Sequence, residues 1–322
     1  MSVTIKNVLQ AEEKMMRDTY CRVLTELAGK DQNIMALDAD LMSSSGMKPF
    51  MKAFPDRFVN CGIAEANMVG VAAGLSAMGY VPFAHTFGTF ATRRVCDQIF
   101  MSAAYAKLNV RIIGTDPGVC AAYNGGTHMP LEDMAVLRAI PEMILIEPTD
   151  SVMLENLLPQ IAGQRGVYYI RLNRKNAVGV YEAGSAFTIG KGAVLRDGKD
   201  VTLFASGIMV AETLEAVKLL EEQGVSARVV NLFTWKPIDA ELIVESAKQT
   251  GAVVTCENHN VVGGLGSAVA EVLVKNRPVP VEMIGVQDEF GEVGPEDYLR
   301  GRFNLTAVDI AAAAMRAVKR KP

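Results

Sequence analysis

One acidic residue stands out because its neighbours are almost all small or apolar. Glu65 lies in the run GIAEANM (62–68), where a segment with helical spacing begins. Burying a carboxyl group costs free energy unless a polar partner receives it. In a dry site the pKa of Glu65 would rise, so that the carboxyl stays protonated and donates a hydrogen bond near neutral pH. The alternative is an acidic side chain that interacts favourably with a helix N-terminus.

A second segment combines aromatic rings with positive charge. Phe87, Phe90 and the pair Arg93 and Arg94 recur at helical spacing, so two rings and a guanidinium group are expected on one face. Such a face suits a flat heteroaromatic ligand. The alternative is two core phenylalanines beside a surface arginine.

A long polar loop over residues 115–130 carries a further candidate, His128. The loop also contains Thr115, Asp116 and Asn124 and is rich in glycine. An irregular loop of this length inside a compact domain is usually functional. His128 therefore differs from a core histidine, which is expected on an apolar face.

Two more polar segments follow candidate strands, where ligands bind in open α/β sheets. The run DADLMSSS (38–45) contains Asp40 and Ser44, which suit a polyol or a phosphate, or an ordinary capped turn. The run RLNRKN (171–176) contains Arg171 and Arg174, which suit an anion, or a solvated patch.

The composition excludes several classes of protein. The chain has 322 residues, a net charge of −4 and an isoelectric point near 5.6, which argues against a nucleic-acid binder. Its five cysteines are dispersed, which favours reduced thiols in a cytoplasmic protein over disulfides or a zinc site. No secretory segment is evident, and no apolar run approaches the roughly 20 residues that span a bilayer, so no membrane partner is expected. Half of the residues are hydrophobic, which favours an oligomer with buried interfaces.

Short apolar runs alternate with amphipathic stretches, which predicts an α/β fold with two domains and mainly parallel sheets. In the first domain we expect strands at 33–37, 57–61, 81–85, 110–114, 143–146 and 167–171, and helices at 12–27, 64–78, 90–106, 131–139 and 151–161. A polar, glycine-containing stretch from 173 to about 200 reads as a linker, so the domains are placed at 1–187 and 188–322.

The second domain repeats the alternation. We expect strands at 201–205, 225–231, 252–256 and 279–284, and helices at 209–223, 239–249, 267–275 and 307–318. The run VGGLGS (262–267) resembles a nucleotide loop but lacks the spacing of the last glycine, so it is interpreted as tight packing of a strand on a helix. His259 beside it is expected to be structural or at an interface.

Taken in order, these motifs resemble the transketolase family. The series is GIAExxM, then FxxF with a nearby arginine, then GGTH, the Arg-x-x-Arg strand end, and LFASG and VxGGLG in the second half. The resemblance implies a pyrimidine-binding domain for thiamine diphosphate followed by a transketolase C-terminal domain. The Gly-Asp-Gly motif of the family's diphosphate-binding domain is missing from the sequence. The chain therefore resembles the C-terminal subunit of a split transketolase, and a partner subunit is expected to supply the diphosphate domain and Mg²⁺.

The resemblance implies roles for individual residues. Glu65 matches the glutamate that hydrogen-bonds the aminopyrimidine ring, and His128 matches the histidine that faces the substrate; both are expected to be catalytic. Cofactor contacts are implied for Asp40, Glu65, Phe87, Phe90 and Arg93. Substrate contacts are implied for Arg17, Ser44, Thr115, Asn124, His128 and Arg174. No metal ligand is expected in this chain.

The implied reaction is ketol (glycolaldehyde) transfer between sugar phosphates in a cytoplasmic hetero-oligomer with two copies of each subunit. Thr115 and Asn124 replace the usual histidine and aspartate of transketolases, which predicts a shifted preference for an unusual or branched sugar phosphate. The alternatives are the beta subunit of a 2-oxo-acid dehydrogenase and a non-catalytic interaction subunit. The former usually carries His-Ser-Gln where this chain has Thr127-His128-Met129-Pro130.

Overall fold

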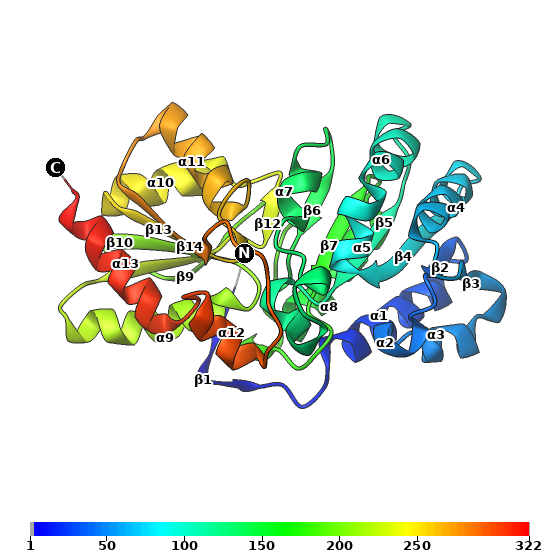
Figure 1. The fold of residues 1–322 in the computed structure, drawn as a ribbon, viewed down its shortest axis with the longest axis horizontal. Helices are drawn as coiled ribbons and strands as arrows, with labels where there is room; N and C mark the ends of the chain where they lie inside the picture. The colour runs from blue at the N-terminus through cyan, green and yellow to red at the C-terminus, as the bar shows by residue number, and fades with distance from the viewer. Residues whose placement is uncertain (1–2, 322) are drawn as a thin grey trace.

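The computed structural model describes residues 3–321 and shows the two domains side by side (Figure 1). The first domain contains six mutually parallel strands in the spatial order β6-β7-β5-β4-β2-β3. They are β2 (Ile34–Asp38), β3 (Phe58–Asn60), β4 (Val81–Phe87), β5 (Arg111–Thr115), β6 (Ile144–Ile146) and β7 (Tyr168–Leu172). Every residue of β2, β5 and β7 is buried, as expected for a parallel sheet that is covered on both faces.

The second domain contains four mutually parallel strands in the order β14-β13-β10-β11. They are β10 (Val201–Ala205), β11 (Ala227–Asn231), β13 (Val253–Asn260) and β14 (Val281–Val286). The expected α/β architecture of two mainly parallel domains is confirmed.

Helices cover the sheets. The first domain has α1 (Met16–Lys30), α2 (Met42–Ser45), α3 (Lys48–Ala53), η1 (Pro55–Arg57), α4 (Glu65–Ala77), α7 (Asp133–Arg138) and α8 (Ser151–Gly163). The second has α9 (Met209–Glu222), α10 (Ala240–Thr250), α11 (Leu265–Asn276), α12 (Glu296–Arg302) and α13 (Ala307–Lys319). Their sequences explain their limits: α10 begins where the Asp239 side chain accepts from the Leu242 amide and ends at Gly251, whose φ is 71°.

The stretch that we expected to be a linker contains two strands. β8 (Val178–Tyr181) pairs antiparallel with β1 (Ile5–Ala11), and β9 (Ala193–Arg196) joins β11 antiparallel at the edge of the second sheet. Like β1, the strand β12 (Thr234–Lys236) was not expected; it pairs antiparallel with β6 and so extends the first domain's sheet with a segment from the second half of the chain. These strands are three to seven residues long and are held by distant partners, which local periodicity does not reveal. The boundary near residue 188 lies between β8 and β9 and stays a prediction.

The single helix expected over 90–106 is broken into four short pieces. They are α5 (Gly88–Ala91), η2 (Arg93–Val95), α6 (Cys96–Gln98) and the π-helical turn η3 (Ile99–Tyr105). The break lies at Thr92, whose backbone leaves the helical region at φ −130° and ψ −87° while its hydroxyl donates to the Gly88 carbonyl oxygen at 2.7 Å. The two arginines that follow therefore point in different directions.

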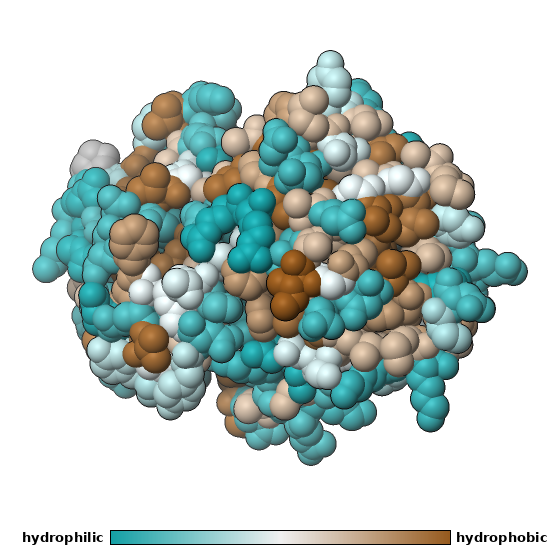
Figure 2. Space-filling model, turned by 45° about the vertical axis from the view of Figure 1, so that its right-hand side comes forward, coloured by the Kyte–Doolittle hydropathy of each residue, from teal (hydrophilic) through white to brown (hydrophobic). Residues whose placement is uncertain are grey.

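Some large apolar side chains remain at the surface. Ile63, Met78 and Tyr105 are 78%, 76% and 76% exposed. In the view of Figure 2, hydrophobic residues are also visible at the surface of the first domain. Exposed apolar groups that lie close together often mark interaction surfaces. Within residues 3–321, no helix combines the length and the hydropathy that crossing a bilayer requires.

Candidate active site

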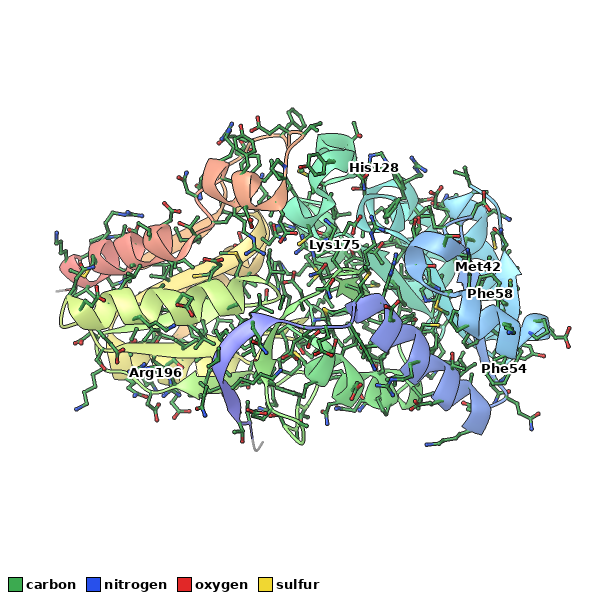
Figure 3. The ribbon with its side chains drawn as sticks, turned by 90° about the horizontal axis from the view of Figure 1, so that it is seen from below. Met42, Phe54, Phe58, His128, Lys175 and Arg196 are labelled. Carbon is green, nitrogen blue, oxygen red and sulfur yellow. The ribbon has the colours of Figure 1, made fainter. Side chains whose placement is uncertain are left out.

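Five polar or aromatic segments meet at one edge of the first domain's sheet. Along the strand order β7-β5-β4-β2-β3, the residues at or after the carboxyl ends are Arg174, Asp116, Phe87, Asp40 and Glu65. Because parallel strands end at the same edge, residues far apart in the sequence are brought together there. Figure 3 shows His128 and Lys175 toward the second domain and Met42 toward the far end of the first.

Glu65 is the first residue of α4, and its side chain is only 4% exposed. Its polar partner is Arg94, whose Nη1 donates to Oε1 and Oε2 at 2.9 Å each. The carboxylate also lies at the positive end of the helix dipole. The sequence predicted a buried carboxyl in need of a partner, and the structure supplies a charged one from the same chain.

Arg94 also joins Glu65 to the aromatic residues. Its guanidinium carbon lies 3.8 Å from the centroid of the Phe90 ring, which is a cation–π contact. The Phe90 centroid is 6.2 Å from Phe87 and 5.2 Å from His128, and the Phe87 centroid is 5.9 Å from His128, all in edge-to-face arrangements. The Arg94 guanidinium therefore lies between the Glu65 carboxylate and Phe90, and Phe90 is one of three rings in mutual contact.

Arg93 lies elsewhere, because the break at Thr92 separates it from the ring face. Its Nη1 donates to Glu132 Oε1 at 2.7 Å, and its Nη2 lies 3.4 Å from the carbonyl oxygen of Thr127. Arg93 thus contacts the loop that carries His128, and Arg94 rather than Arg93 covers Phe90. The contact of Arg93 with a cofactor stays a prediction.

The long loop contributes an ion pair beside the rings. Arg174 Nε donates to Asp116 Oδ1 at 2.6 Å, and its guanidinium carbon lies 5.5 Å from the Phe87 ring centroid. Asp116 is 1% exposed and has a positive φ of 60°, a conformation that costs free energy for a residue with a Cβ. Asn124 Nδ2 lies 3.5 Å from Asp116 Oδ2. Asp116 therefore orients both predicted substrate contacts, a role that its position in the loop alone did not reveal.

The other predicted site residues lie along the same edge. Arg17 Nη1 donates to the carbonyl oxygen of Ser44 at 2.9 Å, and its buried Nε makes no hydrogen bond but lies 3.7 Å from Asp18 Oδ1. Asp40 is held by Asn60, whose Nδ2 donates to Asp40 Oδ1 at 3.0 Å. Thr115 is 4% exposed, and its hydroxyl lies 3.5 Å from the Thr86 carbonyl oxygen.

Arg17 and Arg174 belong to adjacent stretches of backbone. The amide of Met16 donates to the carbonyl oxygen of Lys175 at 3.0 Å, so the residues that carry the two guanidinium groups flank one hydrogen bond. That both contact one anionic group stays a prediction.

Arg171 differs from Arg174, although both follow from the same motif. Arg171 is fully buried, and it donates to Asp133 at 2.8 Å, to Glu147 at 2.6 Å and to the carbonyl oxygen of Asn258 at 2.9 Å. Burial alone would lower the pKa of Arg171, but the charges of Asp133 and Glu147 outweigh burial and raise it above its usual value. The anion site proposed for this motif is therefore reduced to Arg174, and Arg171 joins the two domains. The position of Arg171 inside the apolar strand YYIRL is the sequence feature that indicates its burial.

Two more buried groups of the second domain meet Arg171 and its partners. Burial lowers the pKa of His259 to about 4, and its ring packs edge-to-face on Trp235. Burial raises the pKa of Glu257 to about 8, and its carboxyl accepts from the amides of Leu265 and Gly266. His259 is thus structural, which was one of the two roles that the sequence analysis expected for it. The VGGLGS run packs a helix N-terminus on Glu257, which agrees with the interpretation of tight strand–helix packing.

Family models match nearly the whole chain. Residues 12–178 match the model described as the pyrimidine-binding domain of transketolase, and residues 190–310 match the transketolase C-terminal domain. The chain belongs to the transketolase family. The resemblance found in the sequence motifs is confirmed, and so is the order of the two domains.

Relatives of similar length exist within the transketolase family. The 6-deoxy-6-sulfo-D-fructose transketolase subunit SqwH of Clostridium sp. is 53% identical, with 97% of each chain covered. One of the subunits of the apulose-4-phosphate transketolase of Phocaeicola vulgatus is 36% identical, with 94% of this chain and 97% of that one covered. A solved split-gene transketolase, described as an inactive beta4 tetramer, superposes with a TM-score of 0.90 at 46% identity and covers 96% of this chain and all of its own.

Proposed function

We propose that this chain is the C-terminal subunit of a split transketolase, which transfers a two-carbon ketol (glycolaldehyde) group between anionic sugars with thiamine diphosphate. One observation carries the proposal. A flat, nitrogen-bearing guanidinium group lies between the Phe90 ring, at 3.8 Å, and the Glu65 carboxylate, at 2.9 Å. An aminopyrimidine ring is also flat and presents nitrogen, so it fits the same space when Arg94 moves out.

The chain's own residues have separate tasks. Thiamine diphosphate, when bound, supplies the carbanion chemistry that a ketol transfer needs. When the cofactor is bound, Glu65 would hydrogen-bond the pyrimidine ring, Phe90 would cover the ring face, and Asp40 and Phe87 would border it. His128 is partly exposed beside both rings, where it could donate a hydrogen bond to an oxygen of the substrate.

The anchor for the cofactor's diphosphate is expected on a partner subunit. Within residues 3–321, no group of three His, Cys, Asp or Glu side chains is arranged to hold a metal ion. On the resemblance to split transketolases, we assign Mg²⁺ and the diphosphate to that partner, in a cytoplasmic hetero-oligomer with two copies of each subunit. A beta4 assembly of a relative is described as inactive, which supports this division.

The anionic end of the donor is assigned to Arg17 and Arg174. Asp116 pairs with Arg174, and Asp18 lies 3.7 Å from Arg17, so the two guanidinium groups carry little net positive charge and suit an anion of low charge. A sulfonate carries one negative charge at neutral pH, whereas a phosphate monoester carries about 1.5 to 2. A sulfonated ketose, the substrate class named for the 53% identical relative, is therefore our preferred donor over an unusual or branched sugar phosphate.

Two measurements test the proposal. The chain would be purified with a subunit that carries a Gly-Asp-Gly diphosphate domain, and ketol transfer from 6-deoxy-6-sulfo-D-fructose to an aldose phosphate would be followed with thiamine diphosphate and Mg²⁺. We expect turnover by the complex and none by the chain alone. Calorimetry of the chain alone should show weak cofactor binding. Tight, Mg²⁺-dependent binding without a partner would contradict the division between subunits, and a complex that acts only on 2-oxo acids would support the dehydrogenase alternative.

A further inference from the structure

The second domain contacts the loop of His128 at its beginning, its middle and its end. At the beginning, the Asn258 side chain reaches residues 117–119. At the end, the amide of Asn260 donates to the carbonyl oxygen of Leu131 at 2.8 Å. In the middle, a Cβ at Gly126 would lie 2.1 Å from the carbonyl oxygen of Gly291, so only glycine allows this approach. The loop is thus held by a domain that provides none of the predicted catalytic residues.

Asn258 makes the most specific of these contacts. It is fully buried near the carboxyl end of β13, its Oδ1 accepts from the Val119 amide at 3.0 Å, and its Nδ2 donates to the carbonyl oxygen of Pro117 at 2.9 Å. Both hydrogen bonds are made to backbone on either side of Gly118, where a Cβ would lie 2.2 Å from Asn258 Oδ1. One amide side chain therefore fixes the turn that directly follows Asp116.

Asp116 is the residue whose placement matters for the substrate. Its backbone is held at a positive φ of 60°, and its carboxylate orients Arg174 at 2.6 Å and faces Asn124 at 3.5 Å. A residue in such a conformation persists only where its surroundings enforce it. From the second domain, Asn258 hydrogen-bonds the backbone of Pro117 and Val119, which directly follow Asp116.

We propose that Asn258 is a positioning residue, through which the second domain sets the affinity of the site for the anionic end of the donor. This inference rests on the proposed function for its kinetic consequence but not for its structural one. The loss of both hydrogen bonds frees the 116–124 segment, and Asp116 then no longer holds Arg174 and Asn124 in one arrangement. The hydrogen bonds between Arg94 and Glu65 and the contact of Arg94 with Phe90 do not involve Asn258, so we expect the variant to leave cofactor binding unchanged.

The second domain offers a matched control in Asn231. It too is a fully buried amide at the carboxyl end of a parallel strand, and it too reaches the first domain, where its Nδ2 donates to Thr149 at 2.7 Å and to Tyr181 at 2.6 Å. It does not touch the loop of His128. Asn258→Leu and Asn231→Leu therefore remove similar interdomain hydrogen bonds, but only the first should affect the site.

The first experiment is amide hydrogen exchange of the isolated chain, which needs no partner or substrate. We expect exchange in peptides covering 117–124 to become at least about tenfold faster in Asn258→Leu and to stay unchanged in Asn231→Leu, because the Val119 amide loses its acceptor. Asn258→Asp keeps the acceptor and loses the donor, so its exchange rate should lie between those of the wild type and Asn258→Leu. This variant replaces Asn258→Leu in the experiment if the leucine variant does not fold. Equal exchange in the Asn258 and Asn231 variants would overturn the proposal.

The second experiment uses the complex with its diphosphate-domain partner and two donors. Asn258→Leu should raise KM for 6-deoxy-6-sulfo-D-fructose about tenfold and leave KM for hydroxypyruvate, which lacks the sugar's anionic end, within about twofold. Equal losses on both donors would show a merely structural role and overturn the proposal. An inactive wild-type complex would instead count against the proposed function, while the exchange experiment would still decide the role of Asn258.

Discussion

The two domains carry polar residues at the same place in the same architecture, yet use them differently. At the carboxyl edge of the first sheet, Arg93 and Arg94 are exposed and His128 is partly exposed. At the corresponding edge of the second sheet, Ser206, Glu257 and Asn258 are completely buried, and Ser206 and Asn258 hydrogen-bond the first domain. Polar residues at the end of a strand therefore do not by themselves make a ligand site. They can bind a ligand where they stay exposed, and they hold the domains together where the other domain covers them.

We call the buried carboxyl edge of the second sheet, with the first-domain residues packed on it, the docking edge, and the carboxyl edge of the first sheet the open edge. The difference predicts that a substitution at the docking edge causes a large loss of stability. Arg171→Met leaves Asp133 and Glu147 as buried carboxylates without their cation and should lower the free energy of unfolding by about 3 to 5 kcal/mol. Urea unfolding measures this loss. Arg22→Met, which breaks only exposed ion pairs with Glu26 and Glu155, is the control and should cost about 1 kcal/mol or less. Similar losses in both variants would contradict the role assigned to Arg171.

The open edge should respond in substrate affinity rather than stability. Arg174→Ala removes a charged contact to the donor and should raise KM for 6-deoxy-6-sulfo-D-fructose about tenfold to a hundredfold, with little change for hydroxypyruvate. Steady-state kinetics of the complex gives both values. An equal effect on both donors would show that Arg174 supports the fold or the cofactor geometry and does not bind the donor's anionic group.

A buried histidine of the first domain should make the free energy of unfolding depend on pH. His85 accepts from the Tyr20 hydroxyl, and burial lowers its pKa to about 4. Between pH 6.5 and pH 4 the unfolded chain binds a proton that the folded chain does not, so stability falls as the pH falls. Lowering the pH from 6.5 to 5.0 should therefore destabilise the wild type by about 1 to 2 kcal/mol more than His85→Gln. Parallel pH dependence of the two proteins in urea unfolding would rule this out.

The smallest expected effect concerns Arg94. Its ion pair with Glu65 must break before a pyrimidine ring can approach, and Arg94 is 46% exposed, so the pair is partly screened by solvent. Arg94→Ala should tighten thiamine diphosphate binding to the complex about fivefold, corresponding to about 1 kcal/mol. Calorimetry measures the change. Weaker binding in the variant would show that Arg94 holds the cofactor instead of competing with it.

Local patterns were sufficient to predict most of the fold. Apolar runs predicted the parallel strands, and the small-residue run after Gly62 placed Glu65 at the start of α4. Loops that follow parallel strands necessarily meet, so the site's location also followed from the sequence.

The rest depends on contacts between distant residues. The choice of Arg94 over Arg93 arises from the helix break at Thr92, and the pairing of β1 with β8 joins opposite ends of the first domain. Asn258 lies 139 residues from the amide that it binds, so no local signal links it to the loop of His128. Such interactions are selected by tertiary packing, which overrides local preference.

Two buried glutamates at helix N-termini provide the most direct test of the central comparison. Glu65 begins α4 at the open edge, and Glu257 accepts from the first amides of α11 at the docking edge. The measurement is the rate of C2 proton exchange of thiamine diphosphate bound to the complex. Glu65→Gln should slow it about a hundredfold or more, because glutamine cannot deliver a proton, whereas Glu257→Gln should leave it unchanged. An unchanged rate in Glu65→Gln, or equal slowing in both variants, would contradict the assignment of chemistry to the first edge alone.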